Sequence, residues 1–227
     1  MRILFTAFLT LFFVKASNAQ SDQWPVYELD NRISIELPGE VFEMDTVVKA
    51  ESLYQLYAEF QGALFIAQII SYEKDSEGRY PGLPSDSGSL EKYYRNVVKG
   101  IMNTTQNKLQ SSKAVDINGL SGYELVLSFE KKPTRMSRIL LVENKLISLV
   151  YNDELSFDTD VANMFFKSID ITDIASVNQY PGPSNDILVG ETIGKVIGYI
   201  LTIVLIIFVV RTASKKRNKA QKAEEND

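Results

Sequence analysis

The chain has 227 residues, a net charge of −5, and neither cysteine nor histidine. The missing cysteine rules out disulfides, and the missing histidine rules out Ser-His-Asp triads, histidine general bases and almost every zinc site. A chain of this length is expected to hold one domain plus additional segments.

The first 19 residues have the pattern of a secretory signal. Arg2 is followed by an uncharged apolar run from Ile3 to Val14, and small residues stand at Ser17 and Ala19. This run is too short to cross a hydrocarbon core of about 30 Å, so we interpret residues 1–19 as a cleaved signal peptide. An uncleaved signal anchor is the alternative. No cysteine follows the apolar run, so lipoprotein processing is excluded.

Residues 20–173 are interpreted as one extracytoplasmic domain, which begins with strand patterns. Residues 32–37 (RISIEL) alternate and end at a Pro-Gly turn. Residues 53–60 place Tyr54, Leu56, Ala58 and Phe60 on one face. Residues 63–72 are almost continuously apolar, which predicts a strand covered on both sides.

A polar loop and a helix are expected next. Residues 74–89 are rich in Gly, Pro and Ser, and a loop of this length is either a partner-binding loop or a mobile connection. Residues 90–103 carry apolar side chains at helical spacing, with Ser89 as the expected N-cap. Asn103 begins a glycosylation sequon, which matters only in a eukaryotic secretory pathway.

The second half of the domain is expected to form a meander and a last helix. Asn118-Gly119 predicts a hairpin turn, followed by strands at 123–129, 137–143 and 145–151. Asp158 or Asp160 is expected to cap a helix that runs to about Ser168. Its predicted inner face is Val161, Met164 and Phe165.

This order of elements indicates an α+β fold, an antiparallel β-sheet covered by helices. The segments ISIELPGEVF, INGLSGYELVLSF, RILLVENKLISLVY and FFKSIDI together resemble the PsbP-like α/β/α sandwich. The resemblance implies the fold over nearly all of residues 24–171. It implies no catalytic residue and no cofactor, because its motifs are packing motifs.

Four carboxylates cluster near the last helix, in the sequence YNDELSFDTD. Asp153, Glu154, Asp158 and Asp160 have a spacing that can hold Ca²⁺, but the glycine and the distal glutamate of an EF-hand loop are missing. A solvated loop with a helix N-cap explains the same residues more simply, so we predict no metal site.

The domain is followed by a stalk and a membrane anchor. Residues 174–189, which include QYPGPSND, are interpreted as a stalk. Ile193 to Val210 is an 18-residue apolar run, about 27 Å long as a helix, and we predict a transmembrane helix over 190–210. The basic tail 211–227 predicts a cytoplasmic C-terminus under the positive-inside rule. The protein is therefore expected in the cell (inner) membrane with its N-terminal domain outside or periplasmic.

Glycines at 190, 194 and 198 form a small-xxx-small series on one face of the predicted membrane helix. Such a series favours helix–helix association and thus homo-oligomerisation through this segment, although glycine is also common in membrane helices generally. Glu191, Lys195 and Arg211 are charges at the membrane edges. Glu191 and Lys195 can pair with each other, or with a partner subunit.

The charge distribution limits the partners. Between residues 20 and 186, 25 acidic side chains outnumber 15 basic ones, which argues against nucleic acid. The chain has no Gly-x-Ser-x-Gly, Ser-x-x-Lys or P-loop sequence. These observations predict a non-enzymatic binding or assembly module that recognises a protein partner at the membrane. The alternatives are a small-ligand sensor domain and a carboxylate-dependent enzyme.

Overall fold

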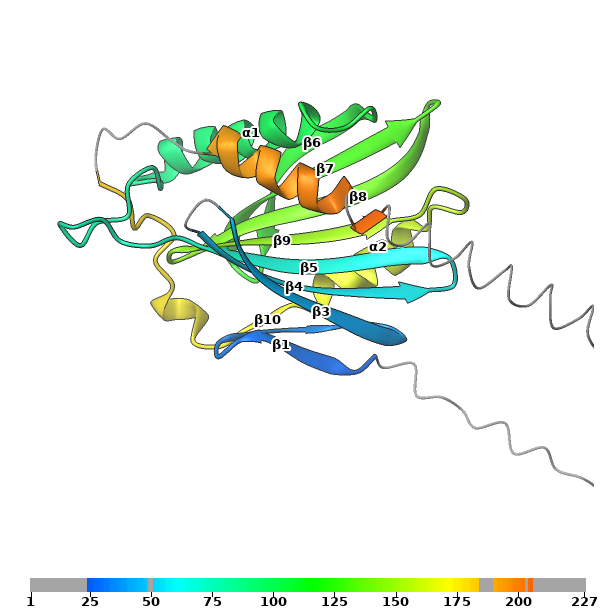
Figure 1. The fold of residues 1–227 in the computed structure, drawn as a ribbon, viewed down its shortest axis with the longest axis horizontal. Helices are drawn as coiled ribbons and strands as arrows, with labels where there is room; N and C mark the ends of the chain where they lie inside the picture. The colour runs from blue at the N-terminus through cyan, green and yellow to red at the C-terminus, as the bar shows by residue number, and fades with distance from the viewer. Residues whose placement is uncertain (1–23, 49–50, 184–189, 203, 206–227) are drawn as a thin grey trace, which may run out of the picture.

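The computed structural model describes residues 24–48, 51–183, 190–202 and 204–205. The predicted signal peptide, the tail 211–227 and Arg211 lie outside these residues. The described chain forms a seven-stranded and a three-stranded antiparallel sheet with helices on both faces of the larger one (Figure 1). The predicted α+β class, with an antiparallel sheet covered by helices, is confirmed.

The larger sheet has the strand order β3-β4-β5-β9-β8-β7-β6, and every neighbouring pair is antiparallel. The smaller sheet has the order β1-β2-β10. The strands are β1 (Val26–Asp30), β2 (Ile33–Glu36), β3 (Glu40–Val48), β4 (Glu51–Phe60), β5 (Ala63–Ser71), β6 (Lys108–Ile117), β7 (Leu120–Phe129), β8 (Lys132–Val142), β9 (Lys145–Asn152) and β10 (Asp170–Ile171).

The predicted strands are present, and β5 is buried over eight consecutive residues, as its continuous apolar run predicts. The Pro-Gly turn is formed with Gly39 at φ 70°, and the Asn118-Gly119 hairpin turn has both φ values positive. β6 was not predicted, because its exposed side chains give it no apolar alternation.

Helix α1 (Ser87–Met102) is longer at its start than predicted, and its N-cap is Asp86 instead of Ser89. The Asp86 carboxylate accepts a hydrogen bond from the Ser89 backbone N–H at 2.7 Å, and Ser89 Oγ accepts one from the Asp86 N–H at 3.0 Å. Ser89 is thus the third residue of a reciprocal capping box, and the prediction placed the cap three residues too late.

Helix α2 (Thr159–Lys167) begins after Asp158, whose carboxylate accepts hydrogen bonds from two backbone N–H groups. Its buried residues are Ala162, Phe165 and Phe166, so the predicted inner position of Met164 is wrong. The Met164 side chain is 42% exposed, because the buried stripe lies one residue further along the helix. A short 3₁₀ helix, η1 (Ile174–Ser176), follows β10.

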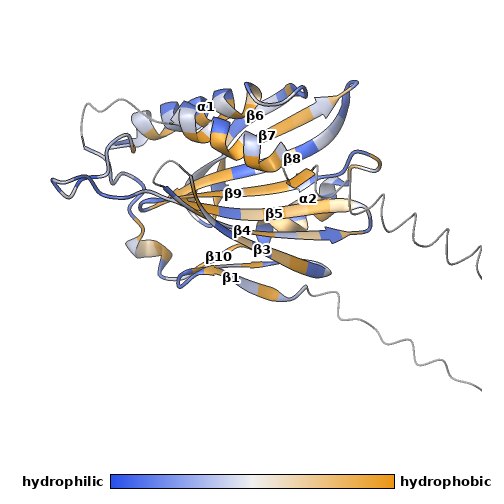
Figure 2. Ribbon diagram, viewed as in Figure 1, coloured by the Kyte–Doolittle hydropathy of each residue, from blue (hydrophilic) through white to orange (hydrophobic). Residues whose placement is uncertain are grey.

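The apolar residues form two cores, one on each face of the larger sheet. One core joins the sheet to α2 and the small sheet and includes Ile35, Phe65, Tyr151 and Phe165. The other joins the sheet to α1 and to a helix formed by residues 190–202 and 204–205, here named the C-terminal helix. Figure 2 shows the central strands as mainly hydrophobic ribbons between these layers.

The described part of the predicted stalk, residues 174–183, runs along the domain. Gln179 is 6% exposed and hydrogen-bonds the backbone of Ser121 and Leu141. The Gly182 N–H donates to Pro84 O at 2.8 Å. Within the described residues, no helix is long and apolar enough to cross a membrane.

Candidate functional site

The C-terminal helix lies beside α1 through the three predicted glycines. The Gly190 Cα faces the backbone of Tyr93, Gly194 faces Val97 and Gly100, and Gly198 faces the Thr104 side chain. Because the residue numbers rise together, the two helices run parallel, as Figure 1 shows for the orange helix and α1. The predicted glycine series therefore contacts another helix of the same chain.

The contact between the two helices is close enough to exclude side chains. A Cβ added at Gly100 would lie 2.7 Å from the Cα of Gly194, and one added at Gly194 would lie 2.9 Å from the Cα of Gly100. Atoms this close must move apart, so alanine at either position would push the helices away from each other. We name this contact, formed by Gly100, Gly190, Gly194 and Gly198, the glycine seam.

The predicted membrane-edge charges lie at the exposed rim of the glycine seam. Glu191 accepts hydrogen bonds from Lys99 Nζ at 2.7 Å and from Asn103 Nδ2 at 3.4 Å, and it forms an ion pair with Lys195 at 3.1 Å. The predicted Glu191–Lys195 pair is thus present, with Lys99 of α1 as a second basic partner. These contacts hold the start of the C-terminal helix against α1.

The other side of the C-terminal helix is buried against the domain. Its buried residues belong to the same apolar core as α1 and strands β4, β5, β7, β8 and β9. They are Ile193, Val196, Ile197, Ile200, Leu201 and Val204. Tyr199 is 61% exposed and marks the outer side. The sheet face that α1 covers therefore also accepts a second helix, and we name this surface, formed by α1 and strands β4, β5, β7, β8 and β9, the helix-accepting face.

Polar side chains lie within this apolar layer. Gln55 on β4, Gln68 on β5 and Ser148 on β9 are directly opposite one another across three neighbouring strands. They share the strand face of Leu53, Ile66 and other members of the α1 core, since side chains alternate along a strand. We name these three residues the polar row.

A buried arginine lies on the same face. Arg135 on β8 is 5% exposed and donates from Nε to Asn152 Oδ1 at 3.1 Å. Among the described residues it forms no ion pair with a carboxylate. Burial lowers the pKa of Arg135 to about 10, because the charged guanidinium has lost its water.

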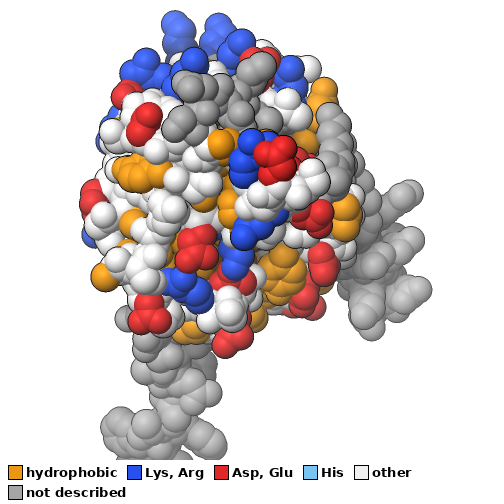
Figure 3. Space-filling view, turned by 90° about the vertical axis from the view of Figure 1, so that its left-hand side faces the viewer, with side chains coloured by type: hydrophobic (Ala, Val, Ile, Leu, Met, Phe, Trp, Pro, Cys, Tyr) orange, Lys and Arg blue, Asp and Glu red, His pale blue; other side chains and the backbone are white. Residues whose placement is uncertain are grey.

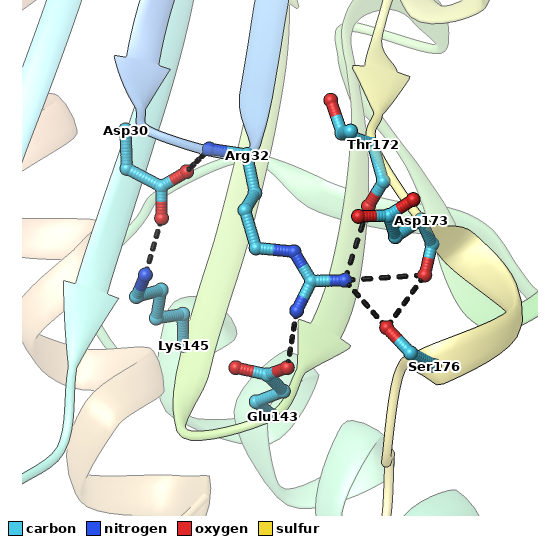
Figure 4. Close-up of polar contacts among 7 residues, drawn as sticks. All are labelled: Asp30, Arg32, Glu143, Lys145, Thr172, Asp173 and Ser176. Carbon is cyan, nitrogen blue, oxygen red and sulfur yellow. Dashed lines mark hydrogen bonds and ion pairs between the residues drawn. The ribbon is translucent and has the colours of Figure 1, made fainter.

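A second polar cluster joins the small sheet to the large one (Figure 4). Arg32 Nη1 binds Glu143 at 2.6 Å, and its Nη2 donates to the backbone oxygens of Thr172 and Asp173 and to Ser176 Oγ. Asp30 accepts from the Arg32 N–H and from Lys145 Nζ. Because the guanidinium is held by Glu143 in the β8–β9 turn and by three groups of the segment 172–176, we assign this cluster a structural role.

In the acidic cluster that was considered as a calcium site, two of the aspartates bind nearby backbone N–H groups. Asp153 accepts hydrogen bonds from the backbone of Leu155 and Ser156, and Asp158 caps α2. Within the described ranges, no group of three or more Asp and Glu residues is placed to hold a metal ion.

The 74–89 loop is ordered locally by Asp75, which accepts hydrogen bonds from the Glu77 and Arg79 backbone. A depression beside α2, lined by Glu36, Asp160, Asn163, Met164, Lys167 and Ser168, is wide open to solvent. In Figure 3, hydrophobic side chains lie scattered among charged ones on the face shown.

The helix-accepting face combines close helix contacts at the glycine seam with buried polar side chains. We therefore take it as the candidate functional site.

The polar row and Arg135 were not predicted from the sequence. Gln55 and Gln68 interrupt apolar strands, which is a detectable signal. Their alignment with Ser148, however, depends on strand pairing that sequence periodicity does not provide.

No protein-family model and no curated protein matches the chain. Among solved structures, cyanobacterial PsbP (CyanoP) from Synechocystis sp. PCC 6803 is similar, with a TM-score of 0.43 and 13% identity. The similarity covers 70% of this chain and 98% of that chain, and at this level it carries no argument about activity.

Proposed function

We propose that this chain is an exported, single-pass membrane protein whose extracytoplasmic PsbP-like domain binds a protein partner and has no catalytic activity. The proposal rests on how the C-terminal helix packs against the domain. Its backbone contacts α1 at the glycine seam, and its apolar side chains share a core with the sheet. A face that receives one helix in this way has the shape and chemistry to receive another.

The proposed anchor and the seated helix share residues. The predicted membrane span is 190–210, and residues 190–202 and 204–205 lie on the domain. One segment cannot cross a bilayer and fill the face at the same time. Insertion into the membrane therefore vacates the face, and a helix of the partner protein takes its place.

Topology is tested with protease added to intact spheroplasts. We expect the domain to be digested and the basic tail to be protected. A protected domain would overturn the extracytoplasmic assignment. The cysteine-free sequence allows the tail to be followed with a single added label.

Partner binding is tested by photo-crosslinking in cells from position 103, at the rim of the glycine seam. We expect a discrete adduct with another protein. Gly100→Leu should abolish the adduct, because a side chain at Gly100 fills the glycine seam into which a partner helix would pack. Gly88→Leu, on the same helix with its nearest neighbouring atom at 3.5 Å, is the matched control. An absent adduct in the native chain, or one that persists in the Gly100→Leu variant, would overturn the proposal.

A further inference from the structure

The polar row is completely buried. Gln55 and Gln68 are 0% exposed and Ser148 is 1% exposed. In the strand register, the row Leu53, Ile70 and Leu146 lies on one side of it, and the row Tyr57, Ile66 and Val150 on the other. The three side chains are therefore surrounded by apolar or aromatic neighbours on their own sheet face.

The polar row is not satisfied by hydrogen bonds. Among the described residues, seven buried side-chain nitrogen and oxygen atoms have no partner, and five of them are the Nε2 and Oε1 atoms of both glutamines and Ser148 Oγ. Buried polar groups are nearly always hydrogen-bonded, since a missing bond costs the whole desolvation of the group. Five buried polar atoms without hydrogen bonds in one row therefore require an explanation.

The C-terminal helix cannot satisfy these atoms with its buried side chains. All of the buried residues that it contributes to this core are isoleucine, leucine or valine. Its described polar side chains are turned elsewhere: Glu191 and Lys195 pair at the rim, Thr192 and Tyr199 are exposed, and Thr202 Oγ1 donates to Gly198 O at 2.9 Å. The helix fits the face in shape at the glycine seam but does not match the polar row in hydrogen bonding.

We propose that the polar row is the recognition site for a partner helix that carries amide or hydroxyl side chains, and that the C-terminal helix is a displaceable cover over it. The proposal rests on the proposed function and specifies the partner. The partner helix has small residues toward Gly100 and Asn, Gln, Ser or Thr toward the row. A second copy of this chain is not the partner, because its helix would bring the same apolar residues.

The test uses the full-length chain in detergent, with the Thr104→Cys/Gly198→Cys pair as the reporter. The yield of the disulfide in a glutathione redox buffer compares how often the C-terminal helix is seated in different variants, because the shift that a Cβ at 198 requires beside Thr104 is the same in all of them. In the first comparison, the polar row is made apolar by Gln55→Leu, Gln68→Leu and Ser148→Ala. We expect the disulfide equilibrium constant to rise about fivefold or more, because an apolar helix then meets an apolar face. An unchanged or lower constant would overturn the proposal.

The second comparison asks whether the row recognises polar side chains. Ile193, Ile197 and Leu201 are replaced one at a time by glutamine, with the native row and with the apolar row. Each replacement should lower the disulfide equilibrium constant. For at least one position, we expect the loss to be about fivefold smaller with the native row than with the apolar row, and this difference gives the coupling energy of a double-mutant cycle. Equal losses at all three positions would overturn the recognition role.

Two controls keep these outcomes separate from other effects. Gln55→Met and Gln68→Met, which keep side-chain length, replace the leucine variants if circular dichroism shows that those fail to fold, and the same rise in the disulfide constant is expected. No partner or membrane is present, so the result is independent of the spheroplast and photo-crosslinking tests. A crosslinked adduct without a coupling energy in the double-mutant cycle would overturn only the recognition role of the polar row. A coupling energy without an adduct would overturn the proposed function.

Discussion

The two faces of the seven-stranded sheet are closed in different ways, and two arginines on β8 show the difference. Arg138 points to the α2 face, where it binds Glu124 at 2.9 Å and Asn163 at 3.3 Å and lies over the Phe166 ring. Arg135 points to the opposite face and donates a side-chain hydrogen bond to Asn152. One face is closed by matched polar pairs, and the other keeps unmatched polar groups under a helix.

This difference indicates which layer can open. On the α2 face, separation of helix and sheet would break the contacts of Arg138 with Asn163 and Phe166 together with an aromatic core, which makes opening costly. On the α1 face, removal of the C-terminal helix loses apolar contacts but gives water or a partner access to the polar row. A cover held by shape, apolar contact and one exposed ion pair is easier to exchange, because an ion pair open to solvent contributes little stability.

The largest expected effect is on the α2 face. Phe165 is 0% exposed and packs against Phe65 at a ring distance of 5.4 Å, so Phe165→Ala should lower the free energy of unfolding by about 4 kcal/mol. Met164→Ala, at the exposed neighbouring position, should change it by less than about 0.5 kcal/mol. Urea unfolding followed by tryptophan fluorescence measures both. Similar losses would contradict the observed burial of α2.

Breaking the matched pair on the same face should have the next largest effect. The Glu124 side chain is 7% exposed, and Arg138→Met would leave it with Lys113, at 3.3 Å, as its remaining ion-pair partner. We expect a loss of about 3 kcal/mol, because an incompletely paired buried charge is costly. The double variant Arg138→Met/Glu124→Leu should recover most of the loss. No recovery would show that the arginine acts through its packing on Phe166.

On the helix-accepting face, the glycine seam should respond to a single methyl group. Gly100→Ala should reduce the stability of the seated helix by about 2 kcal/mol, since the new Cβ would lie 2.7 Å from Gly194. Gly88→Ala, on the same helix with its nearest neighbouring atom at 3.5 Å, should instead stabilise by up to about 1 kcal/mol. The yield of the 104–198 disulfide and urea midpoints measure both. A stabilising Gly100→Ala would show that the helices do not touch there.

The sequence predicted the elements with strong local patterns and missed those set by tertiary contacts. Alternation located β4, and Asn118-Gly119 located the turn that precedes β7. β6 was missed because an edge strand with exposed side chains needs no apolar face. The glycine series indicated helix association, but a lone Gly100 in α1 gave no sign that it was the partner.

The smallest expected effect tests the unmatched arginine directly. Arg135→Met should raise the free energy of unfolding at pH 7 by about 1–2 kcal/mol, because it removes a buried charge whose lost hydration outweighs its attraction to Glu154 and which forms no ion pair among the described residues. The pKa of Arg135 is about 10 in the folded chain, below its ordinary value of 12.5, so the folded state binds this proton less tightly than the unfolded state. The cost of the charge is therefore fully present below pH 10 and falls as the pH rises from 10 toward 12.5. The advantage of the methionine variant in urea unfolding should shrink between pH 9 and pH 11, with Arg95→Met on the exposed side of α1 as the control. An advantage that grows over this range would mean that Arg135 has a matched acidic partner, and the two faces would then differ only in shape.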